Sequence, residues 1–144
     1  MIISFTGTQK GMTSYQKMSF LKVMQFLKAK RNVTHFNHGD CIGADADAHE
    51  IVSNIDIPIH IYPGTDKRGA SPKRAFCING TTHKAQEYLI RNKKMVDLCT
   101  VLVACPAESI EQLRSGTWST IRYAKKIKIP IVTIYPDGTI QKNF

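Results

Sequence analysis

The sequence predicts an α/β fold, a single Rossmann-like domain in three layers with helices on both faces of a mainly parallel five-stranded sheet. Short apolar runs alternate along the chain with segments of helical periodicity, which is typical of such folds. The apolar runs are continuous, as burial of a parallel strand on both faces demands. The chain has 144 residues, about the size of one domain, so we expect residues 1–144 to form a single unit.

The N-terminal half supplies three of the predicted strands. Residues 2–5 are an apolar run that ends in a polar, glycine-containing loop, which indicates a buried strand and a tight turn. A helix is predicted from Ser14, a good capping residue, because apolar residues then recur three and four positions apart as far as Leu27. Strands at residues 33–37 and 58–62 flank a predicted helix at residues 44–53.

The C-terminal half continues the alternation after a long irregular segment. Residues 63–83 show no period, and a loop of this length in a compact domain is usually functional or mobile. The elements predicted after it are a helix at 84–98, a strand at 100–105, a helix that includes Trp118 and ends near Ile127, and a strand at 130–135. The turn sequence Pro136-Asp137-Gly138 favours a short C-terminal edge strand at residues 139–143.

Composition excludes several classes of protein. Hydrophobic residues make up 42% and charged residues 22%, which excludes disordered and collagen-like chains. No apolar run is long enough to cross a membrane, and the N-terminus does not resemble a signal peptide, so we expect a cytoplasmic protein without a membrane partner. The sequence shows no close pair of cysteines, so we expect free thiols and neither a metal nor a cofactor; the four are Cys41, Cys77, Cys99 and Cys105.

The formal net charge of +9 is compatible with nucleic acid, an acidic membrane or a small phosphorylated ligand as a partner. The charge is spread along the whole chain, and there is no polybasic tail. The densest group of cations is Lys67, Arg68, Lys73 and Arg74. These side chains form either an ordinary solvated loop or a lid that steers phosphates toward the strand ends.

Three glycine-containing turns fall where a Rossmann-like fold binds its ligands, at the carboxyl ends of the strands. They contain Gly7, residues 39–43 and Gly116. Glycine allows a ligand to approach the backbone closely, and a helix N-terminus favours an anion. The strict dinucleotide and P-loop fingerprints are absent, which disfavours a dehydrogenase and a P-loop NTPase. The three turns together favour a shared phosphate site.

Four motifs in this order resemble the SLOG superfamily, named for the SMF/DprA and LOG proteins. They are Thr6-Gly7-Thr8, the turn His38-Gly39-Asp40-Cys41-Ile42-Gly43-Ala44-Asp45, the helix Arg91-Asn92-Lys93-Lys94-Met95, and Arg114-Ser115-Gly116-Thr117. The similarity is greatest to a small branch with His-Gly-x-x-x-Gly-Ala-Asp and Arg-Asn-x-x-Met motifs, and it covers residues 2–135. It implies a Rossmann-like fold that binds nucleotides or nucleotide-derived molecules at the strand ends.

The resemblance and the turns together indicate a set of ligand-binding residues. These are Thr6, Gly7, Thr8, His38, Gly39, Asp40, Gly43, Asp45, Arg91, Arg114, Ser115, Gly116 and Thr117. In LOG-type hydrolases a glutamate follows the Gly-Thr pair, and Thr120 stands at that position here. Because a neutral threonine cannot support charge on a sugar as its base leaves, the hydrolase function loses support.

Several residues keep two interpretations at the level of sequence. Arg91 is either a solvated helix cation or a ligand contact, and Asp45 is either a capping charge or an acceptor for ribose hydroxyls. Trp118 either packs in the core or stacks on a base. His38 and His83 are either structural or polar contacts to a ligand.

The predicted function is binding of a nucleotide or nucleotide-derived signalling molecule, ADP-ribose-like or cyclic, by a sensor or sequestering protein without turnover. One alternative is a nucleoside-phosphate N-glycosidase or a deoxyribosyl-transferring relative, for which Arg91 and Asp45 are the catalytic candidates, with Asp45 or Glu87 replacing the missing carboxylate. A second is single-stranded nucleic-acid binding of the DprA type, disfavoured because aromatic residues are few and not interleaved with cations. The resemblance also implies a homo-oligomer, a dimer or tetramer.

Overall fold

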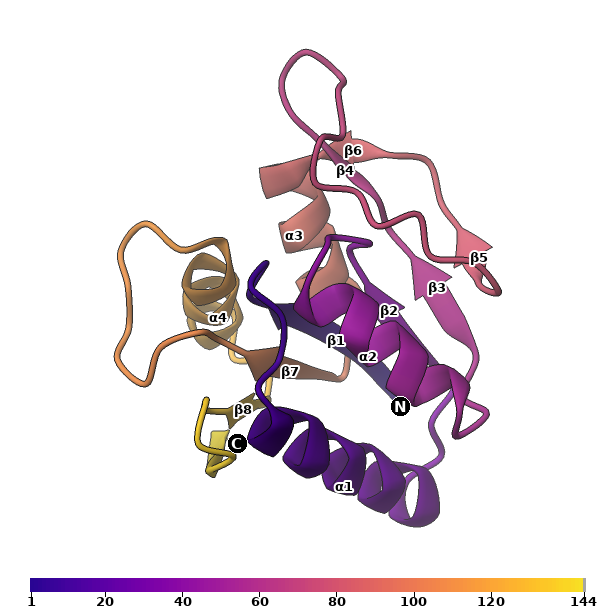
Figure 1. The fold of residues 1–144 in the computed structure, drawn as a ribbon, viewed down its shortest axis with the longest axis vertical. Coiled ribbons are helices and arrows are strands. Elements are labelled where there is room, and N and C mark those ends of the chain that lie inside the picture. The colour runs from indigo at the N-terminus through magenta and orange to yellow at the C-terminus, as the bar shows by residue number, and fades with distance from the viewer. Residues whose placement is uncertain (144) are drawn as a thin grey trace.

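Strand β1 (Ile2–Gly7) lies in the middle of a seven-stranded sheet in the computed structural model, which describes residues 1–143 (Figure 1). The strand order is β5-β3-β2-β1-β7-β8-β9, and every neighbouring pair is parallel except β8 and β9. The other strands are β2 (His35–His38), β3 (Ile59–Ile61), β5 (Thr81–Thr82), β7 (Val101–Cys105), β8 (Ile131–Ile134) and β9 (Ile140–Asn143).

Two helices cover each face of this sheet, which confirms the predicted three layers. Helices α1 (Ser14–Lys30) and α2 (Ala44–Ser53) pack on one face, and α3 (Tyr88–Leu98) and α4 (Gly116–Lys126) pack on the other. Strand β7 is buried along its whole length. Val101 and Val103 pack in the core under α1 and α2, and Leu102 packs in the core under α3 and α4. Burial on both faces is the reason that this strand is a continuous apolar run.

The order of the strands reverses between β1 and β7. After β1 the chain adds β2 and β3 on one side, and it then returns to add β7 and β8 on the other. The loops that leave the carboxyl ends of β1 and β7 therefore diverge to opposite faces of the sheet. In open α/β sheets the crevice at this point is the usual ligand site.

The predicted count of five strands is wrong, because the sheet has seven. Strand β9 is the edge strand expected after the turn at Pro136-Asp137-Gly138, and it pairs antiparallel with β8. Strand β5 comes from the segment predicted to be irregular, and it extends the other edge of the sheet by pairing with β3. Two residues carry too little periodicity to reveal such a strand in a sequence.

The segment before α3 also differs from the prediction of a helix that starts at residue 84. Strand β6 (Gln86–Glu87) pairs in parallel with β4 (Gly64–Thr65), so that helix α3 begins only at Tyr88. This second, two-stranded sheet lies at one end of the molecule, beside the start of α3 (Figure 1). It connects the end of β3 to the helix that carries Arg91.

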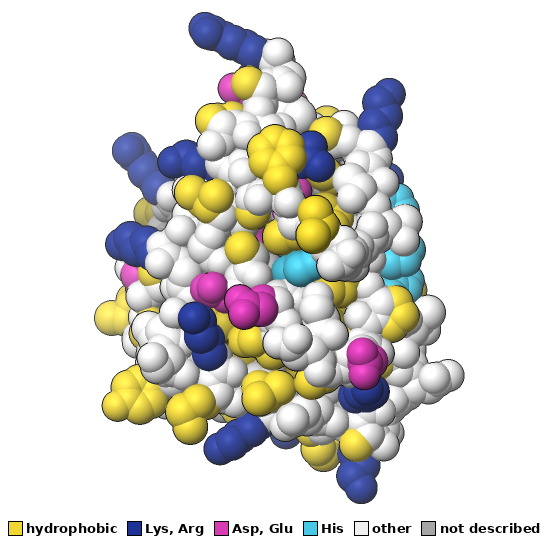
Figure 2. Space-filling model, turned by 45° about the vertical axis from the view of Figure 1, so that its right-hand side comes forward, with side chains coloured by type: hydrophobic (Ala, Val, Ile, Leu, Met, Phe, Trp, Pro, Cys, Tyr) yellow, Lys and Arg dark blue, Asp and Glu magenta, His cyan; other side chains and the backbone are white. Residues whose placement is uncertain are grey.

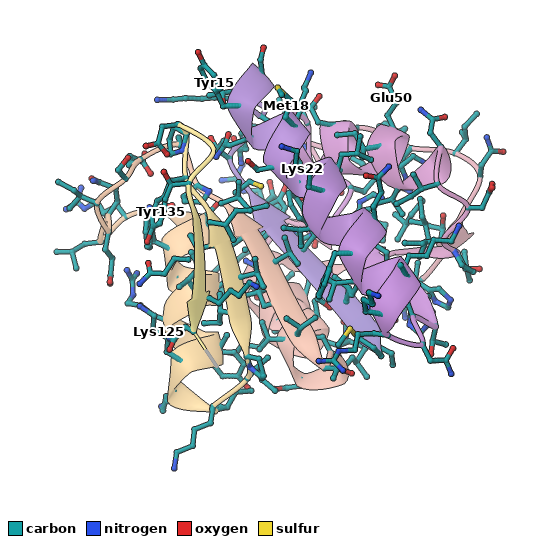
Figure 3. The ribbon with its side chains drawn as sticks, turned by 90° about the horizontal axis from the view of Figure 1, so that it is seen from below. Tyr15, Met18, Lys22, Glu50, Lys125 and Tyr135 are labelled. Carbon is teal, nitrogen blue, oxygen red and sulfur yellow. The ribbon has the colours of Figure 1, made fainter. Side chains whose placement is uncertain are left out.

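Helix α1 shows how local sequence sets an element's boundary. Its N-cap is Thr13, whose hydroxyl accepts from the Gln16 N–H at 3.0 Å while the Gln16 side chain accepts from the Thr13 N–H, a capping box. Ser14, the predicted cap, is the first helical residue. On the outer side of α1, Tyr15 and Met18 point away from the sheet (Figure 3). None of the helices within residues 1–143 is both long and apolar enough to span a bilayer.

Candidate functional site

A cavity of about 630 Å³ opens at the carboxyl ends of β1 and β7, where the strand order reverses. The loop after β1, the β2–α2 turn, one side of α3, the N-terminus of α4 and part of the loop after β4 form its walls. Nine of the thirteen predicted ligand-binding residues line it: Thr6, Gly7, Thr8, Asp45, Arg91, Arg114, Ser115, Gly116 and Thr117. The structure therefore brings the four sequence motifs together around one space.

Arg91 is a buried cation in the wall of this cavity, with 4% of its surface exposed. Its Nη1 donates to the carbonyl oxygen of Gly39 at 2.6 Å and to that of Tyr62 at 2.8 Å. Its Nε donates to the Asn92 side chain at 2.7 Å, and its Nη2 donates to the Cys41 sulfur at 3.7 Å. Among residues 1–143 no carboxylate forms an ion pair with it. Its positive charge thus remains available to an anion.

Asp45 lies on the other side of this arginine, at the start of α2. Its Oδ2 accepts hydrogen bonds from the N–H groups of Gly39 at 3.2 Å and Cys41 at 3.1 Å, so it closes the β2–α2 turn. Burial raises the pKa of the Asp45 carboxyl to about 6, although the Arg91 charge and the two N–H donors oppose that rise. This position is compatible with both roles expected for Asp45, a capping charge and an acceptor for ribose hydroxyls, because the residue organises the turn and also lines the cavity.

The floor of the cavity depends on close packing between the loop after β1 and the start of α2. A Cβ added to Gly7 would lie 2.5 Å from the Cβ of Ala44. Gly43 has a φ of +89° and an added Cβ would lie 2.3 Å from the Gln9 carbonyl oxygen, so only glycine fits. The Ala44 N–H donates to the Thr8 carbonyl at 2.9 Å and joins the two segments.

The N-terminus of α4 faces the cavity from the opposite side. The hydroxyl of Ser115, the N-cap, accepts from the Trp118 N–H at 3.2 Å, and the first turn carries no acidic residue. Around Gly116 no atom lies within 4 Å of an added Cβ, so the backbone there is open. The N–H groups of a first helical turn lack intrahelical acceptors and carry partial positive charge, which suits a phosphate.

Two side chains on α4 do not face the cavity. Trp118 is 4% exposed and packs in the core between α3, α4 and the sheet, which favours the structural interpretation over base stacking. The Thr120 hydroxyl donates to the Gly116 carbonyl at 2.9 Å, within its own helix. The position expected for a catalytic glutamate is thus occupied by a buried threonine that bonds to the backbone.

The four remaining predicted residues lie behind the cavity wall and hold the β2–α2 turn. Asp40 is 1% exposed; its Oδ2 accepts from Arg74 Nε and its Oδ1 from the Cys77 N–H, both at 2.9 Å. His38 is fully buried, and Gly39 leaves no room for a side chain beside Arg91. With Gly43, these residues shape the site without lining it.

The four cations of the predicted lid divide into three groups. Lys73 lines the cavity, Arg74 is held by Asp40, and the exposed Lys67 and Arg68 line no part of the cavity. The positive charge is spread out, as the sequence predicted. Lysine and arginine side chains are scattered over the face shown in Figure 2 and form no single patch there.

Sequence reasoning missed several residues that line the cavity: Lys10, Cys41, Tyr88, Asn92 and Glu108. Glu108, three residues after β7, is the second carboxylate there and accepts from the Trp118 indole N–H at 3.1 Å. Its position after a buried strand was the available signal. Of the two carboxylates named from the sequence, Asp45 lines the cavity, whereas Glu87 occupies the N-cap position of α3 outside it. Burial and the adjacent Asp45 raise the pKa of the Cys41 thiol to about 11, which keeps it protonated.

Comparisons with known proteins show similarity in structure alone. No protein-family model matches the sequence, and no curated protein matches it either. The molybdenum cofactor binding protein from the phototrophic bacterium Rippkaea orientalis is similar in structure, with a TM-score of 0.67 and 15% identity over 93% of this chain and 76% of that one. The protein TM1055 is similar with a TM-score of 0.63 and 15% identity, over 90% and 71% of the two chains. These similarities establish the shared α/β fold.

Proposed function

We propose that this chain is a SLOG-type protein that binds a phosphorylated nucleotide or nucleotide-derived molecule in the cavity between β1 and β7, without turning it over. The proposal is supported by the charge of the cavity wall, which contains Lys10, Lys73, Arg91 and Arg114 against the two carboxylates of Asp45 and Glu108. It is also supported by the fold, since one protein of similar structure is described as a cofactor binding protein.

The observation that carries the proposal is the unpaired charge of Arg91 opposite a helix N-terminus. The Asp45 carboxylate acts on Arg91 through its charge but forms no ion pair with it, so the buried guanidinium can still bind an anionic partner. Here Arg91 and the first turn of α4 line the same space. An anionic group between them would receive charge-assisted hydrogen bonds from both.

The rest of the cavity suits the remainder of a nucleotide. Asp45 uses Oδ2 for the turn, which leaves Oδ1 for a ribose hydroxyl. Tyr88, beside Arg91 in the wall, offers an aromatic face, and its buried hydroxyl has no hydrogen-bond partner within residues 1–143. A volume of about 630 Å³ lies within the range of small-molecule sites.

The test uses calorimetry with a panel of nucleoside monophosphates, cyclic nucleotides and ADP-ribose. Arg114→Gln removes an exposed cation from the cavity rim and should weaken binding about tenfold without a change in stability. The matched control is Arg68→Gln, an exposed cation outside the cavity, which should leave affinity unchanged. Chromatography of the recovered ligand should return it intact. Equal affinity in both variants, or no binding by the panel, would refute the proposal.

A second candidate, an N-glycosidase acting on nucleoside phosphates, is favoured by one specific observation. Glu108 and Asp45 place two carboxylates in the cavity although position 120 holds threonine. Release of free base during incubation would support this function over simple binding. Single-stranded nucleic-acid binding stays a prediction, which a gel-shift series across salt concentrations would test. Assembly into a dimer or tetramer also stays a prediction, which sedimentation would test.

A further inference from the structure

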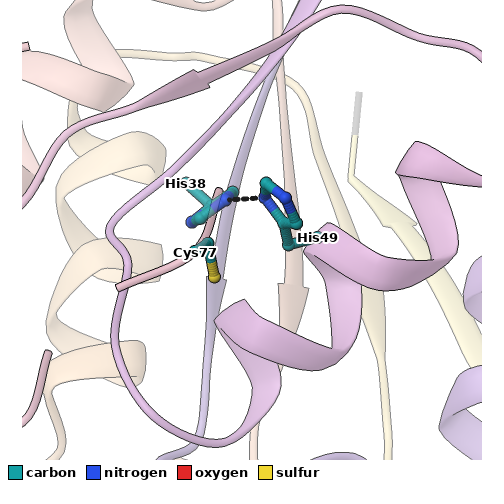
Figure 4. A group of neighbouring side chains, drawn as sticks. All are labelled: His38, His49 and Cys77. Carbon is teal, nitrogen blue, oxygen red and sulfur yellow. Dashed lines mark hydrogen bonds between the residues drawn. The ribbon is translucent and has the colours of Figure 1, made fainter. Parts of the chain in front are cut away.

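Behind the wall of the cavity, on the other side of the β2–α2 turn, two histidines and a cysteine lie together. One ring nitrogen from His38, one from His49 and the sulfur of Cys77 all lie within 4.8 Å of one another (Figure 4). His38 ends strand β2, His49 lies on α2, and Cys77 belongs to the loop after β4. The two imidazoles are linked directly, with His38 Nε2 2.8 Å from His49 Nδ1.

We propose that His38, His49 and Cys77 bind a thiophilic transition-metal ion of the Zn²⁺ class, which clamps the loop carrying Cys77 to strand β2 and helix α2. Imidazole nitrogen and thiolate sulfur both bind zinc, and with three protein ligands the fourth position of the ion is left to water. The site is distinct from the nucleotide cavity, since none of the three residues lines that cavity.

The orientation of His49 favours this role. Its Nε2 lies 2.6 Å from the carbonyl oxygen of Ile78, which only accepts, so the ring proton is on Nε2. The Nδ1 lone pair therefore points at His38. A backbone carbonyl that fixes the distal ring proton is the usual second partner of a metal-binding histidine.

His38 is also neutral, as a ligand must be. Its Nδ1 accepts from the Asp40 N–H at 2.9 Å, so its proton lies on Nε2 and is shared with His49. When Nε2 binds the metal, this proton moves to Nδ1, so the Asp40 N–H loses its acceptor and must turn away from a second donor. That loss is small beside the free energy of zinc coordination.

Cys77 supplies the charged ligand and the route of entry. His38 is fully buried and His49 nearly so, whereas Cys77 is partly exposed, so an ion reaches the histidines past the sulfur. The metal binds as the Cys77 thiol releases its proton to solvent, because the ligand is the thiolate. The Asp40 carboxylate, which accepts from the Cys77 N–H and pairs with Arg74, adds negative charge nearby.

The clamp would act on the segment that carries Lys73. In this structure the Asp40–Arg74 ion pair holds that segment. Two backbone hydrogen bonds add to it: the Ala75 N–H donates to the Asp40 carbonyl at 2.7 Å, and the Ile42 N–H donates to the Lys73 carbonyl at 2.8 Å. A bond from a metal to Cys77 would add a cross-link between the loop and two elements of the core.

Co²⁺ titration of the untagged, reduced protein tests the proposal, because cobalt substitutes for zinc and reports thiolate ligation by a charge-transfer absorption. We expect this band to saturate at one ion per chain and to disappear when Zn²⁺ is added. Cys77→Ser and Cys77→Ala should abolish the band, and His49→Gln should weaken binding at least tenfold. Cys99→Ser, in the opposite layer, is the matched control and should retain the band.

The surface histidines provide a competing explanation that the same experiment separates. His35, His60 and His83 stack on one another at the edge of the sheet and include no cysteine. Cobalt bound there would give no thiolate band. Absence of the band in the unmodified protein, or its persistence in Cys77→Ser, would overturn the proposal.

Discussion

The Nη1 nitrogen of Arg91 lies 2.6 Å from the carbonyl oxygen of Gly39, and this contact joins two motifs that are 52 residues apart in sequence. It fixes the helix α3 arginine against the β2–α2 turn. The same nitrogen also holds the end of β3 through Tyr62, so one guanidinium defines the relative position of three segments at the cavity wall. A charge placed by this many contacts is preorganised for an anion.

Gly39→Ala should disrupt the site from a residue that does not line the cavity. The added Cβ would lie 2.4 Å from Arg91 Nη1 and 2.7 Å from its Cζ, so the guanidinium must move. We expect a loss of stability of about 1–3 kcal/mol, the usual cost of overpacking, and a loss of ligand affinity of about tenfold or more. Chemical denaturation and calorimetry measure the two effects.

Gly116→Ala is the matched control, because no atom lies within 4 Å of its added Cβ. Stability should change by less than about 0.5 kcal/mol, as for a tolerated surface substitution. If Gly39→Ala is as stable as this control and binds the ligand as well as the unmodified protein does, the packing of Arg91 against the turn has no importance for the site.

Arg91→Lys should fail although it keeps the charge. A lysine ammonium presents no planar fork, so it cannot bond to the Gly39 and Tyr62 carbonyls and still face the cavity. One buried carbonyl left without a donor costs about 1–3 kcal/mol of stability. Affinity for a phosphorylated ligand should fall about tenfold, whereas Lys93→Arg, on an exposed side of α3, should change neither quantity. Retained affinity in Arg91→Lys would show that a point charge is sufficient.

Stability should depend on pH through Asp45. The pKa of Asp45 is about 6 in the folded protein, against an ordinary value of 3.8 that applies to the unfolded chain. The folded state therefore binds the proton more tightly than the unfolded one. Its contribution is therefore fully present below about pH 4 and is lost as pH rises through about 6. Two pKa units correspond to about 3 kcal/mol. The stability of the protein relative to Asp45→Asn should fall by up to this amount between pH 4 and pH 7 in denaturation experiments; a constant difference would contradict the pKa.

The arrangement of the fold was readable because burial leaves a pattern in the sequence. β7 is apolar throughout since helices cover both of its faces, and helix α1 shows its buried positions at Phe20, Met24 and Leu27. Strands β4, β5 and β6 were missed because each has two residues and is held by pairing across the chain. No local property of Thr81 and Thr82 records that β3 lies beside them.

The site was predicted where backbone geometry requires particular residues. Gly7 and Gly43 are dictated by close packing, and the sequence shows them directly. The partners of Asp40 and Asp45 in the β2–α2 turn could not be predicted, because they belong to segments distant in sequence. One is buried against Arg74 and the other lines the cavity. The pairing of Asp40 with Arg74 depends on the path of the irregular segment at residues 63–83, and no sequence pattern predicts that path.

Arg74→Met should release the loop that carries Lys73. It leaves the buried Asp40 carboxylate without its cation, and because Arg74 itself is partly exposed we expect a loss of about 2–3 kcal/mol, below the cost for a fully buried pair. Limited proteolysis should cut the segment near residue 74 faster than in the unmodified protein. Lys67→Met, an exposed cation on the same loop, should leave the cleavage rate unchanged. Equal cleavage in the two variants would show that the Asp40 pair does not hold the loop.

Glu108→Gln distinguishes binding from hydrolysis at the cavity. The Glu108 carboxylate accepts from the Trp118 indole at 3.1 Å, and a glutamine carbonyl can accept the same bond, so the fold should be retained. The substitution also removes one negative charge from a wall that is to receive a phosphate. For a binding protein, affinity should therefore stay the same or rise by about two- to threefold, since an exposed charge interaction is worth less than about 1 kcal/mol. The unmodified protein and the variant should both release no free base, as measured by chromatography of ligand incubated with each. Base release by the unmodified protein that Glu108→Gln abolishes would identify Glu108 as the missing catalytic carboxylate and would replace the binding function with the glycosidase one.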